Sequence, residues 1–125
     1  MAVNYRASLK TARMNLVKDD IDVGVAAGYI EICSAAYASV LATITLSDPC
    51  GSVTGDVLTL TMPKSDTSAD ATGTAAVARI KESAGTTIVN NLTVGTSGTD
   101  IVLTSLAITA GDTVTLSSAT ITHAA

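Results

Sequence analysis

The sequence has almost no large aromatic side chains. Among its 125 residues there is no tryptophan and no phenylalanine, and the aromatics are Tyr5, Tyr29 and Tyr37. Large aromatics normally supply much of the buried area of a small domain. The core must therefore be built from Val, Ile, Leu and Ala, each of which contributes at most about 3 kcal/mol when fully buried. A domain built in this way gains from burial against neighbouring subunits, which is a first indication of an assembly protein.

The chain also lacks a cluster of cations. Seven Lys and Arg residues stand against eleven Asp and Glu residues, so the net charge is −4. The cations are dispersed along the sequence, whereas nucleic-acid binding needs clustered cations that displace counterions from phosphate. We therefore expect no nucleic-acid partner.

Long apolar runs are missing as well. No segment combines the basic start, apolar run and small-residue cleavage site of a signal peptide, and none has the roughly 18 uninterrupted apolar residues of a membrane span. The length suits one core but not two. We expect a single soluble domain over residues 1–125, made in the cytoplasm, with no membrane partner.

Residues that commonly carry chemistry are few. The single histidine, His123, lies two residues from the end of the sequence, where chains usually fray. Cys33 and Cys50 show no metal or redox spacing, and we expect reduced thiols, with a bridge between them as the alternative. Phosphate-loop and nucleophile-turn motifs are absent, and Gly95-x-x-Gly98 is interpreted as a hairpin turn. The sequence predicts a protein that is not an enzyme, with no catalytic, cofactor-binding or metal residues and no cofactor.

The acidic residues gather in two places. Asp66 and Asp70 lie in a polar segment, but the alternating acids of a calcium loop are absent, so a solvated surface loop is favoured over a metal site. Asp19, Asp20 and Asp22 lie at the end of a predicted helix, where negative charge is mildly unfavourable with the helix dipole. They serve either solubility or contact with cations of a partner subunit.

One segment, residues 6–22, has the pattern of an amphipathic helix. Apolar residues recur there three to five positions apart among good helix formers, at Leu9, Ala12, Leu16, Val17 and Ile21. Charged residues fall largely off that stripe, at Lys10, Arg13, Lys18 and Asp19. Gly24 supplies a stop signal. We expect this stripe to pack the helix onto a sheet.

From residue 28 to residue 122 the apolar period changes to two, as in strands. Turns are expected between the strands every 8–12 residues, among them those at 48–51, 83–85, 95–98 and 110–112, and the polar stretch 64–73 is expected to be an exposed loop. The spacing predicts seven or eight short strands in an antiparallel β-sandwich or jelly-roll-like domain. Threonine is frequent on the outward faces, which suits pairing between subunits.

The order of these segments resembles a group of small virion structural proteins encoded by tailed bacteriophages and prophages. The resemblance covers nearly the whole chain, in the helix with its glycine break, the extended run into a Ser-Asp-Pro turn, the loop, strand and hairpin, and the last strands (7–28, 28–51, 66–103 and 105–122). Its most specific pieces are Asp66–Gly73 and the turn Gly95–Gly98.

The resemblance implies a virion component assembled in the host cytoplasm. The role it favours is a head decoration or cement protein that binds the outside of the major capsid lattice. Such proteins bridge major capsid subunits and associate with copies of themselves, often as trimers. A tail, collar or fibre-associated virion protein is the alternative. A carbohydrate- or surface-binding β-module is the second alternative, and the lack of tryptophan makes it less attractive.

Overall fold

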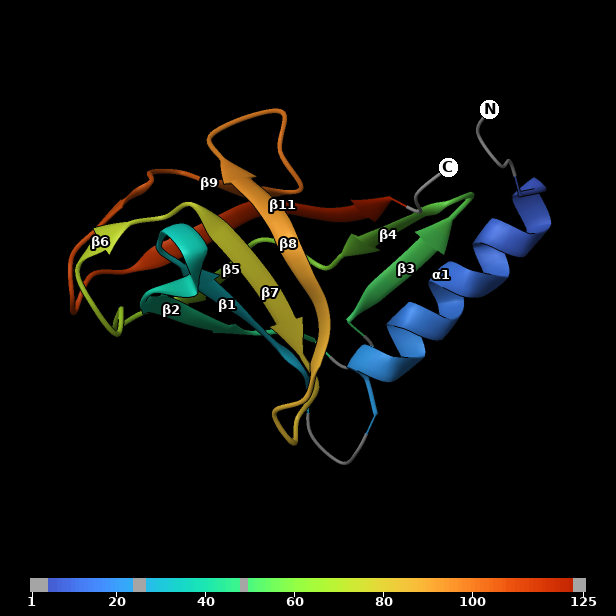
Figure 1. Ribbon diagram of the computed structural model, residues 1–125, viewed down its shortest axis with the longest axis horizontal. Helices are drawn as coiled ribbons and strands as arrows, with labels where there is room; N and C mark the ends of the chain where they lie inside the picture. Colours follow the sequence, from blue (N-terminus) through green and yellow to red (C-terminus); the bar gives the residue numbers. More distant parts are fainter. Residues whose placement is uncertain (1–4, 24–26, 48–49, 123–125) are drawn as a thin grey trace.

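The computed structural model describes residues 5–23, 27–47 and 50–122. It is mainly β, with one α-helix at the N-terminal end of the described chain, as predicted (Figure 1). The elements in order are α1 (Ala7–Ile21), β1 (Tyr29–Cys33), the 3-10 turn η1 (Ala35–Tyr37), β2 (Val40–Thr45), β3 (Gly51–Thr54), β4 (Val57–Leu60), β5 (Lys64–Asp66), β6 (Gly73–Thr74), β7 (Val77–Lys81), β8 (Thr87–Gly95), β9 (Ile101–Leu103), β10 (Ala107–Ile108) and β11 (Val114–Thr122). The helix bounds are confirmed, since Arg6 and Asp22 are its two caps.

Nine of the strands form one sheet. Eight run in the order β2-β1-β7-β8-β9-β11-β4-β3, and β5 pairs with β11 beside that path. The pair β6 and β10 is separate. There are more strands than the seven or eight expected, because very short strands such as β5 and β6 fall in the segment 64–74, most of which reads as a polar loop. The expectation of an exposed loop over 64–73 is corrected accordingly.

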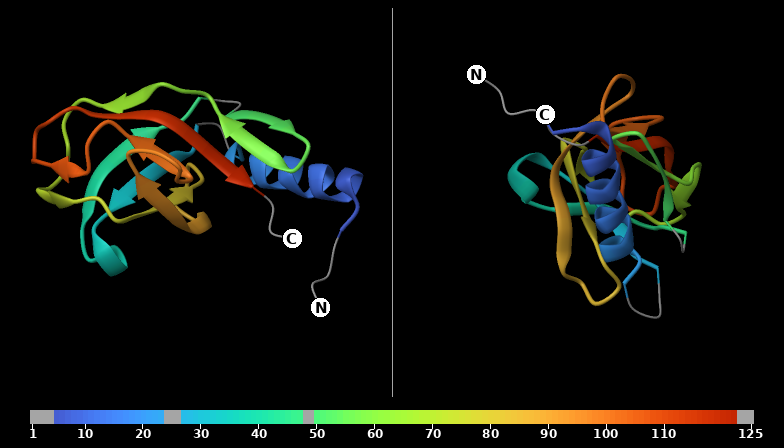
Figure 2. Two further views of the ribbon diagram at one scale, coloured as in Figure 1. Left: turned by 90° about the horizontal axis from the view of Figure 1, so that it is seen from above. Right: turned by 90° about the vertical axis from the view of Figure 1, so that its right-hand side faces the viewer.

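The sheet curls until β5 lies beside β2 (Figure 2). Strands β5 and β2 are joined by side-chain and loop contacts and not by backbone hydrogen bonds between paired strands. Thr43 N donates to Asp66 Oδ2 at 3.0 Å, and the Leu41 carbonyl accepts from Asp70 N at 2.8 Å. An open strand edge is a template for unwanted pairing. The 66–71 segment therefore blocks the outer edge of β2.

One strand pair departs from the antiparallel arrangement. Strands β8 and β9 run parallel over two residue pairs, although five residues connect them. Asp100 Oδ2 accepts from both Thr93 N, at 3.1 Å, and Thr93 Oγ1, at 3.0 Å, which holds this short connection in a compact loop. The hairpin expected at Gly95–Gly98 is therefore wrong, and the sheet is mixed.

The core is aliphatic, as the composition predicts. Its central layer comes from opposed residues of neighbouring strands: Ile30 of β1 lies opposite Ile44 of β2 on one side and Ile80 of β7 on the other. All three side chains are fully buried. Tyr29 and Tyr37 are only half-buried, so neither belongs to the core. Met14 and Ile21 of α1 complete the core at the end of the molecule where β3 and β4 lie.

Candidate interaction surfaces

Helix α1 is attached to the sheet along one face. Met14 and Ile21, seven residues apart, are its buried side chains, and Val17 between them packs partly against the core. Two hydrogen bonds fasten the helix to the β3–β4 hairpin. Thr11 Oγ1 donates to the Gly55 carbonyl at 2.6 Å, and Asp22 Oδ1 accepts from Cys50 N at 2.9 Å. The helix thus lies beside this hairpin (Figure 2).

The opposite face of α1 is apolar too, and it is exposed. Leu9 is 39% exposed and Leu16 is 66% exposed, and Ala12 between them is also exposed. The expectation that Leu9, Ala12 and Leu16 pack against the sheet is therefore wrong. At 100° per residue these three lie opposite Met14 and Ile21. The predicted stripe combined residues of two faces.

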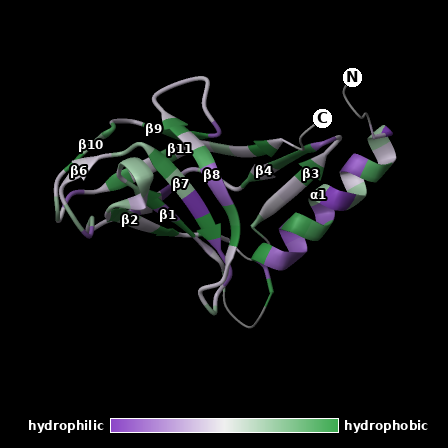
Figure 3. Cartoon of the chain, viewed as in Figure 1, coloured by the Kyte–Doolittle hydropathy of each residue, from purple (hydrophilic) through white to green (hydrophobic). Residues whose placement is uncertain are grey.

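This exposure is concentrated at one place on the molecule. In the described residues the exposed large apolar side chains are Tyr5, Leu9, Leu16 and Val23, all within α1 or next to its ends. We name Tyr5, Leu9, Ala12, Leu16 and Val23 the outer stripe. The hydropathy colouring shows apolar residues recurring along the helix between charged ones (Figure 3). Exposed apolar side chains gathered on one element in this way make the outer stripe a candidate interaction surface.

Apart from Lys18, the charges along α1 are separated by sign. Arg6 and Arg13 lie in the first half, and Asp19 and Asp20 lie near the end. Lys18 Nζ is 3.7 Å from Asp19 Oδ1 and 3.8 Å from Asp22 Oδ2. Cations at the start of a helix and anions at its end oppose the helix dipole, at a cost of a few tenths of a kcal/mol each. The arrangement is therefore not explained by the stability of the isolated helix.

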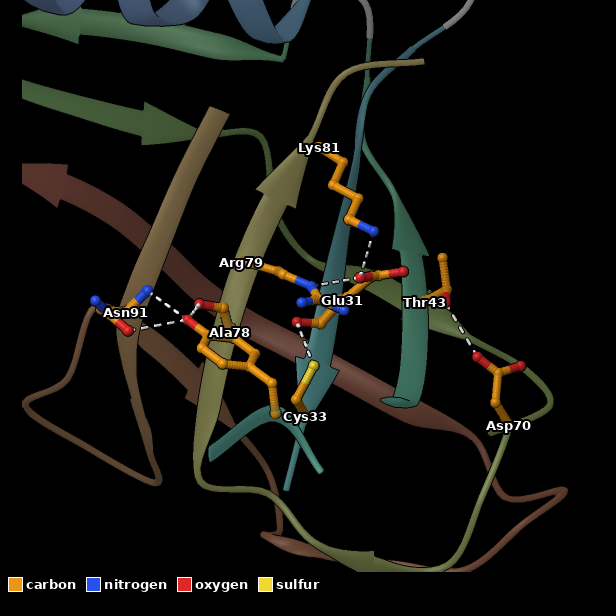
Figure 4. A network of polar contacts seen from close by, with 9 residues as sticks. Glu31, Cys33, Thr43, Asp70, Ala78, Arg79, Lys81 and Asn91 are labelled. Atoms are coloured by element: carbon orange, nitrogen blue, oxygen red, sulfur yellow. Dashed lines mark hydrogen bonds and ion pairs between the residues drawn. The ribbon is translucent and has the colours of Figure 1, made fainter. Parts of the chain in front are cut away.

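A second surface feature is a charged cluster on the outer face of β1 and β7 (Figure 4). Glu31 Oε1 accepts from Arg79 Nε at 2.6 Å and from Lys81 Nζ at 3.2 Å. Glu31 and Arg79 are directly opposed in the β1–β7 register. The Glu31 side chain is 13% exposed. Burial raises the pKa of this carboxyl, but the bonds from Arg79 and Lys81 outweigh burial and hold the pKa below its ordinary value of 4.5.

We predict a pH-dependent effect of Glu31→Gln on stability. A carboxylate whose folded pKa is lowered stabilises the fold above its unfolded pKa, and that stability is lost as the pH falls through the folded pKa. The variant is expected to be less stable by about 1–2 kcal/mol at neutral pH. The difference should narrow once the pH falls below about 4. Urea unfolding of both proteins across the acid range measures it, and a constant difference would contradict this explanation.

Next to this cluster, the Tyr37 hydroxyl forms hydrogen bonds with Asn91 at a bulge in β8. Strand β8 bulges there, because Asn90 and Asn91 stand where one residue would oppose Arg79. Asn91 N donates to the Tyr37 hydroxyl at 2.6 Å, and that hydroxyl donates to Asn91 Oδ1 at 3.2 Å. Tyr37 and Asn91 both have positive φ, which side-chain-bearing residues seldom adopt. The contact therefore holds two strained residues in place.

Tyr37→Phe is expected to lower the free energy of unfolding by about 1–2 kcal/mol, because Asn91 N loses its acceptor. The ring, and its position 5.0 Å from the Arg79 guanidinium, would be kept. Tyr29→Phe is the matched control, since the Tyr29 hydroxyl makes no hydrogen bond to the described residues. Urea titration of the three proteins is the measurement, and equal stability of the two variants would count against the role given to Tyr37.

Of the residues considered for chemistry, the structure describes Cys33, Cys50, Asp66 and Asp70, and it brings Asp66 and Asp70 together at Thr43. His123 lies outside the described residues. Cys33 and Cys50 are free and buried, as expected. Burial raises the pKa of the Cys33 thiol, and burial together with the neighbouring Asp22 raises the pKa of Cys50 to about 12. Both thiols are therefore protonated at neutral pH, which lowers their reactivity.

Asp66 and Asp70 have structural partners. Asp66 Oδ1 accepts from Ser68 N at 3.0 Å while its other oxygen binds β2, and Asp70 Oδ2 accepts from Thr43 Oγ1 at 3.0 Å (Figure 4). No group of three or more His, Cys, Asp or Glu residues suited to a metal occurs within the described ranges. No pocket was found on that part of the molecule either.

The one described helix is not of the length and apolarity that crossing a membrane requires. Comparison with protein-family models, with curated proteins and with solved structures returned no match. Function is therefore argued from the surfaces of this chain. The sequence analysis did not predict the outer stripe as an exposed surface. The signal that could have found it is that α1 has two sets of apolar residues on opposite faces, only one of which, with Met14 and Ile21, can face the sheet.

Proposed function

We propose that the protein is a structural subunit of a tailed-bacteriophage virion, and that it serves as a head decoration or cement protein on the outside of the major capsid lattice. The resemblance of its segments to small phage virion proteins supports this role. The alternative within the same class is a tail, collar or fibre-associated protein. Both make the chain a subunit whose surfaces are built to be covered by other subunits.

The observation that carries the proposal is the outer stripe of α1. The large apolar side chains of the described strands are buried or half-buried, while α1 leaves Leu16 two-thirds exposed on its far side. A solvated helix face needs polar residues only. The side chain of a leucine at such a position is buried only when a partner covers it, as happens between the subunits of an assembly.

A decoration protein stabilises a shell by binding the assembled lattice and not the free capsid subunit, so that binding shifts the equilibrium toward the shell. Repetition over the lattice adds avidity to each weak contact. The blocked edge of β2 leaves no open ladder there for a neighbour's strand. At that edge, we therefore expect contact with the capsid through side chains and loops and not through an added strand.

The test compares particles that contain the protein with particles from which its gene has been deleted. Deletion particles are expected to release their DNA at lower temperature, and adding the purified protein back should restore the original temperature. Labelled protein should decorate the heads of intact particles. Labelling confined to the tail would favour the alternative, and no effect of deletion together with no labelling would overturn the proposal.

A further inference from the structure

We propose that the outer stripe of α1 is the site at which a second copy of this chain binds, with the two helices antiparallel. This inference rests on the proposed function in one respect. The function requires the outer stripe to be covered by another subunit, and the inference says that this subunit is a second copy of the chain. Three observations on the helix carry it: the spacing of the stripe, the row of charges beside it and the direction of those charges.

The first observation is the spacing. From Tyr5 the stripe advances by four, three, four and seven residues to Val23. Alternating steps of four and three residues are the pattern by which one helix packs along another helix. The position between Leu16 and Val23 is Asp19, 71% exposed in its side chain, at the margin of the stripe. The apolar seam is thus strongest in its middle, at Leu9, Ala12 and Leu16.

The second observation is a row of charged residues that flanks the stripe. Arg6, Arg13 and Asp20 follow one another at intervals of seven, so they lie along one side of the seam. The other side carries Ser8, Asn15 and Asp22 at the corresponding positions, and Asp22 is bound within the chain by Lys18 and by Cys50 N. The first flank therefore carries three charges and changes sign from its start to its end, whereas the one charge of the second flank, on Asp22, is already paired within the chain.

The direction of the row selects the partner and its orientation. In an antiparallel pair the charged flanks face each other, and Arg6 of one copy comes within one helical turn of Asp20 of the other, twice by symmetry. In a parallel pair each charged flank would face the partner's flank of Ser8, Asn15 and Asp22, which offers no free cation or anion in register, and the two Asp19 side chains would meet. Antiparallel pairing also opposes the two helix dipoles, which offsets the unfavourable placement of charge within each helix.

The middle of the seam suits this pairing. When Arg6 and Asp20 are brought level, Leu16 of each copy lies beside Ala12 of the other, a large residue against a small one. Arg13 lies near the twofold axis, and its guanidinium is 4.6 Å from the ring of its own Tyr5, which holds it away from the opposite Arg13. The surface is self-complementary, as a twofold contact requires.

The contact is small. Fifteen helical residues make a strip roughly 22 Å long and about 10 Å wide, less than the ~800 Å² per partner of a standard interface. The dimer is therefore expected to dissociate on dilution. Such a weak contact gains strength when many copies are held on one lattice.

The test is sedimentation equilibrium of the full chain over a wide range of concentration. A monomer–dimer equilibrium is expected, and Leu16→Glu should weaken it by about tenfold to a hundredfold, since a leucine loses its burial. Thr104→Glu, which adds the same charge at an exposed position on the sheet side, is the matched control and should leave the dimer unchanged. Circular dichroism shows whether each variant is folded.

Charge reversal tests the orientation without touching the apolar seam. Arg6→Glu alone and Asp20→Arg alone should each weaken the dimer, and the two changes combined in one chain should restore it. A monomer at every concentration, a trimer, or a dimer indifferent to Leu16→Glu would overturn the inference. If the protein is a monomer in solution but present in stoichiometric copies on particles, the dimer is refuted and the proposed function stands. If it is a dimer in solution but absent from particles, the proposed function is refuted and the dimer stands.

Discussion

Ile21→Ala is expected to lower the free energy of unfolding by about 2–5 kcal/mol, the range found when a buried isoleucine or leucine is truncated to alanine. Ile21 is fully buried, and it closes the contact between α1 and the start of β1. A Cβ atom on Gly28, at that start, would lie 3.0 Å from Ile21 Cγ2, so the fit around this side chain is tight. Little room is left for the site to collapse, and the effect should fall in the upper part of the range.

Leu16→Ala is the matched control on the same helix. Both substitutions remove large aliphatic side chains from one element, and alanine suits a helix at both positions. Leu16 is 66% exposed, so its truncation should change the stability of the monomer by less than about 0.5 kcal/mol. Urea unfolding at low protein concentration, where any dimer is dissociated, gives both values. Equal losses would mean that the two faces of α1 have been assigned wrongly.

Gly51→Ala is the second change expected to have a large effect. Gly51 opens β3 opposite Leu60 of β4, and a Cβ atom there would overlap the Thr59 carbonyl oxygen and lie 2.8 Å from Leu60 Cα. These neighbours are backbone atoms, which cannot turn aside as a side chain can. The hairpin must shift, and with it Cys50, whose N–H holds the end of α1 through Asp22. We expect a loss of about 3 kcal/mol or more.

Ser52→Ala in the next position of β3 is its control. Ser52 is exposed and its replacement should alter stability by less than about 0.5 kcal/mol. Thermal unfolding followed by circular dichroism ranks the two variants, and amide exchange shows whether α1 and the β3–β4 hairpin lose protection together in Gly51→Ala. A small effect of Gly51→Ala, with exchange unchanged, would mean that the hairpin does not position the helix.

The bounds of the helix followed from the sequence, but its orientation did not. Apolar residues at steps of three and four identify the segment as helical whichever face they occupy. Helix α1 carries two such series, one with Met14 and Ile21 and one with Leu9 and Leu16. Only the sheet decides between them, because tertiary packing is not encoded in the local period. The prediction drew one stripe through both.

The strands show the same division. The alternating pattern of residues 28–122 corresponds to alternating burial in β4, in β7 and in β1 as far as Ile32, whereas in β2 the neighbours Leu41 and Ala42 are both buried. The three residues of β5 carry no apolar pattern, because this strand is defined by its pairing with β11 and by Asp66 reaching β2. The parallel pairing of β8 and β9 was equally hidden, since a Gly-x-x-Gly turn reads as a hairpin wherever the chain leads next.

The measurement that tests the central claim most directly is the number of copies of this protein in purified phage particles. Quantitative mass spectrometry against the major capsid protein provides it. A lattice-bound decoration protein is expected in a fixed ratio to the major capsid protein, reached in every preparation and kept through washing at moderate salt. Trace amounts that vary between preparations, or that wash away, would contradict the account of this chain as a structural subunit.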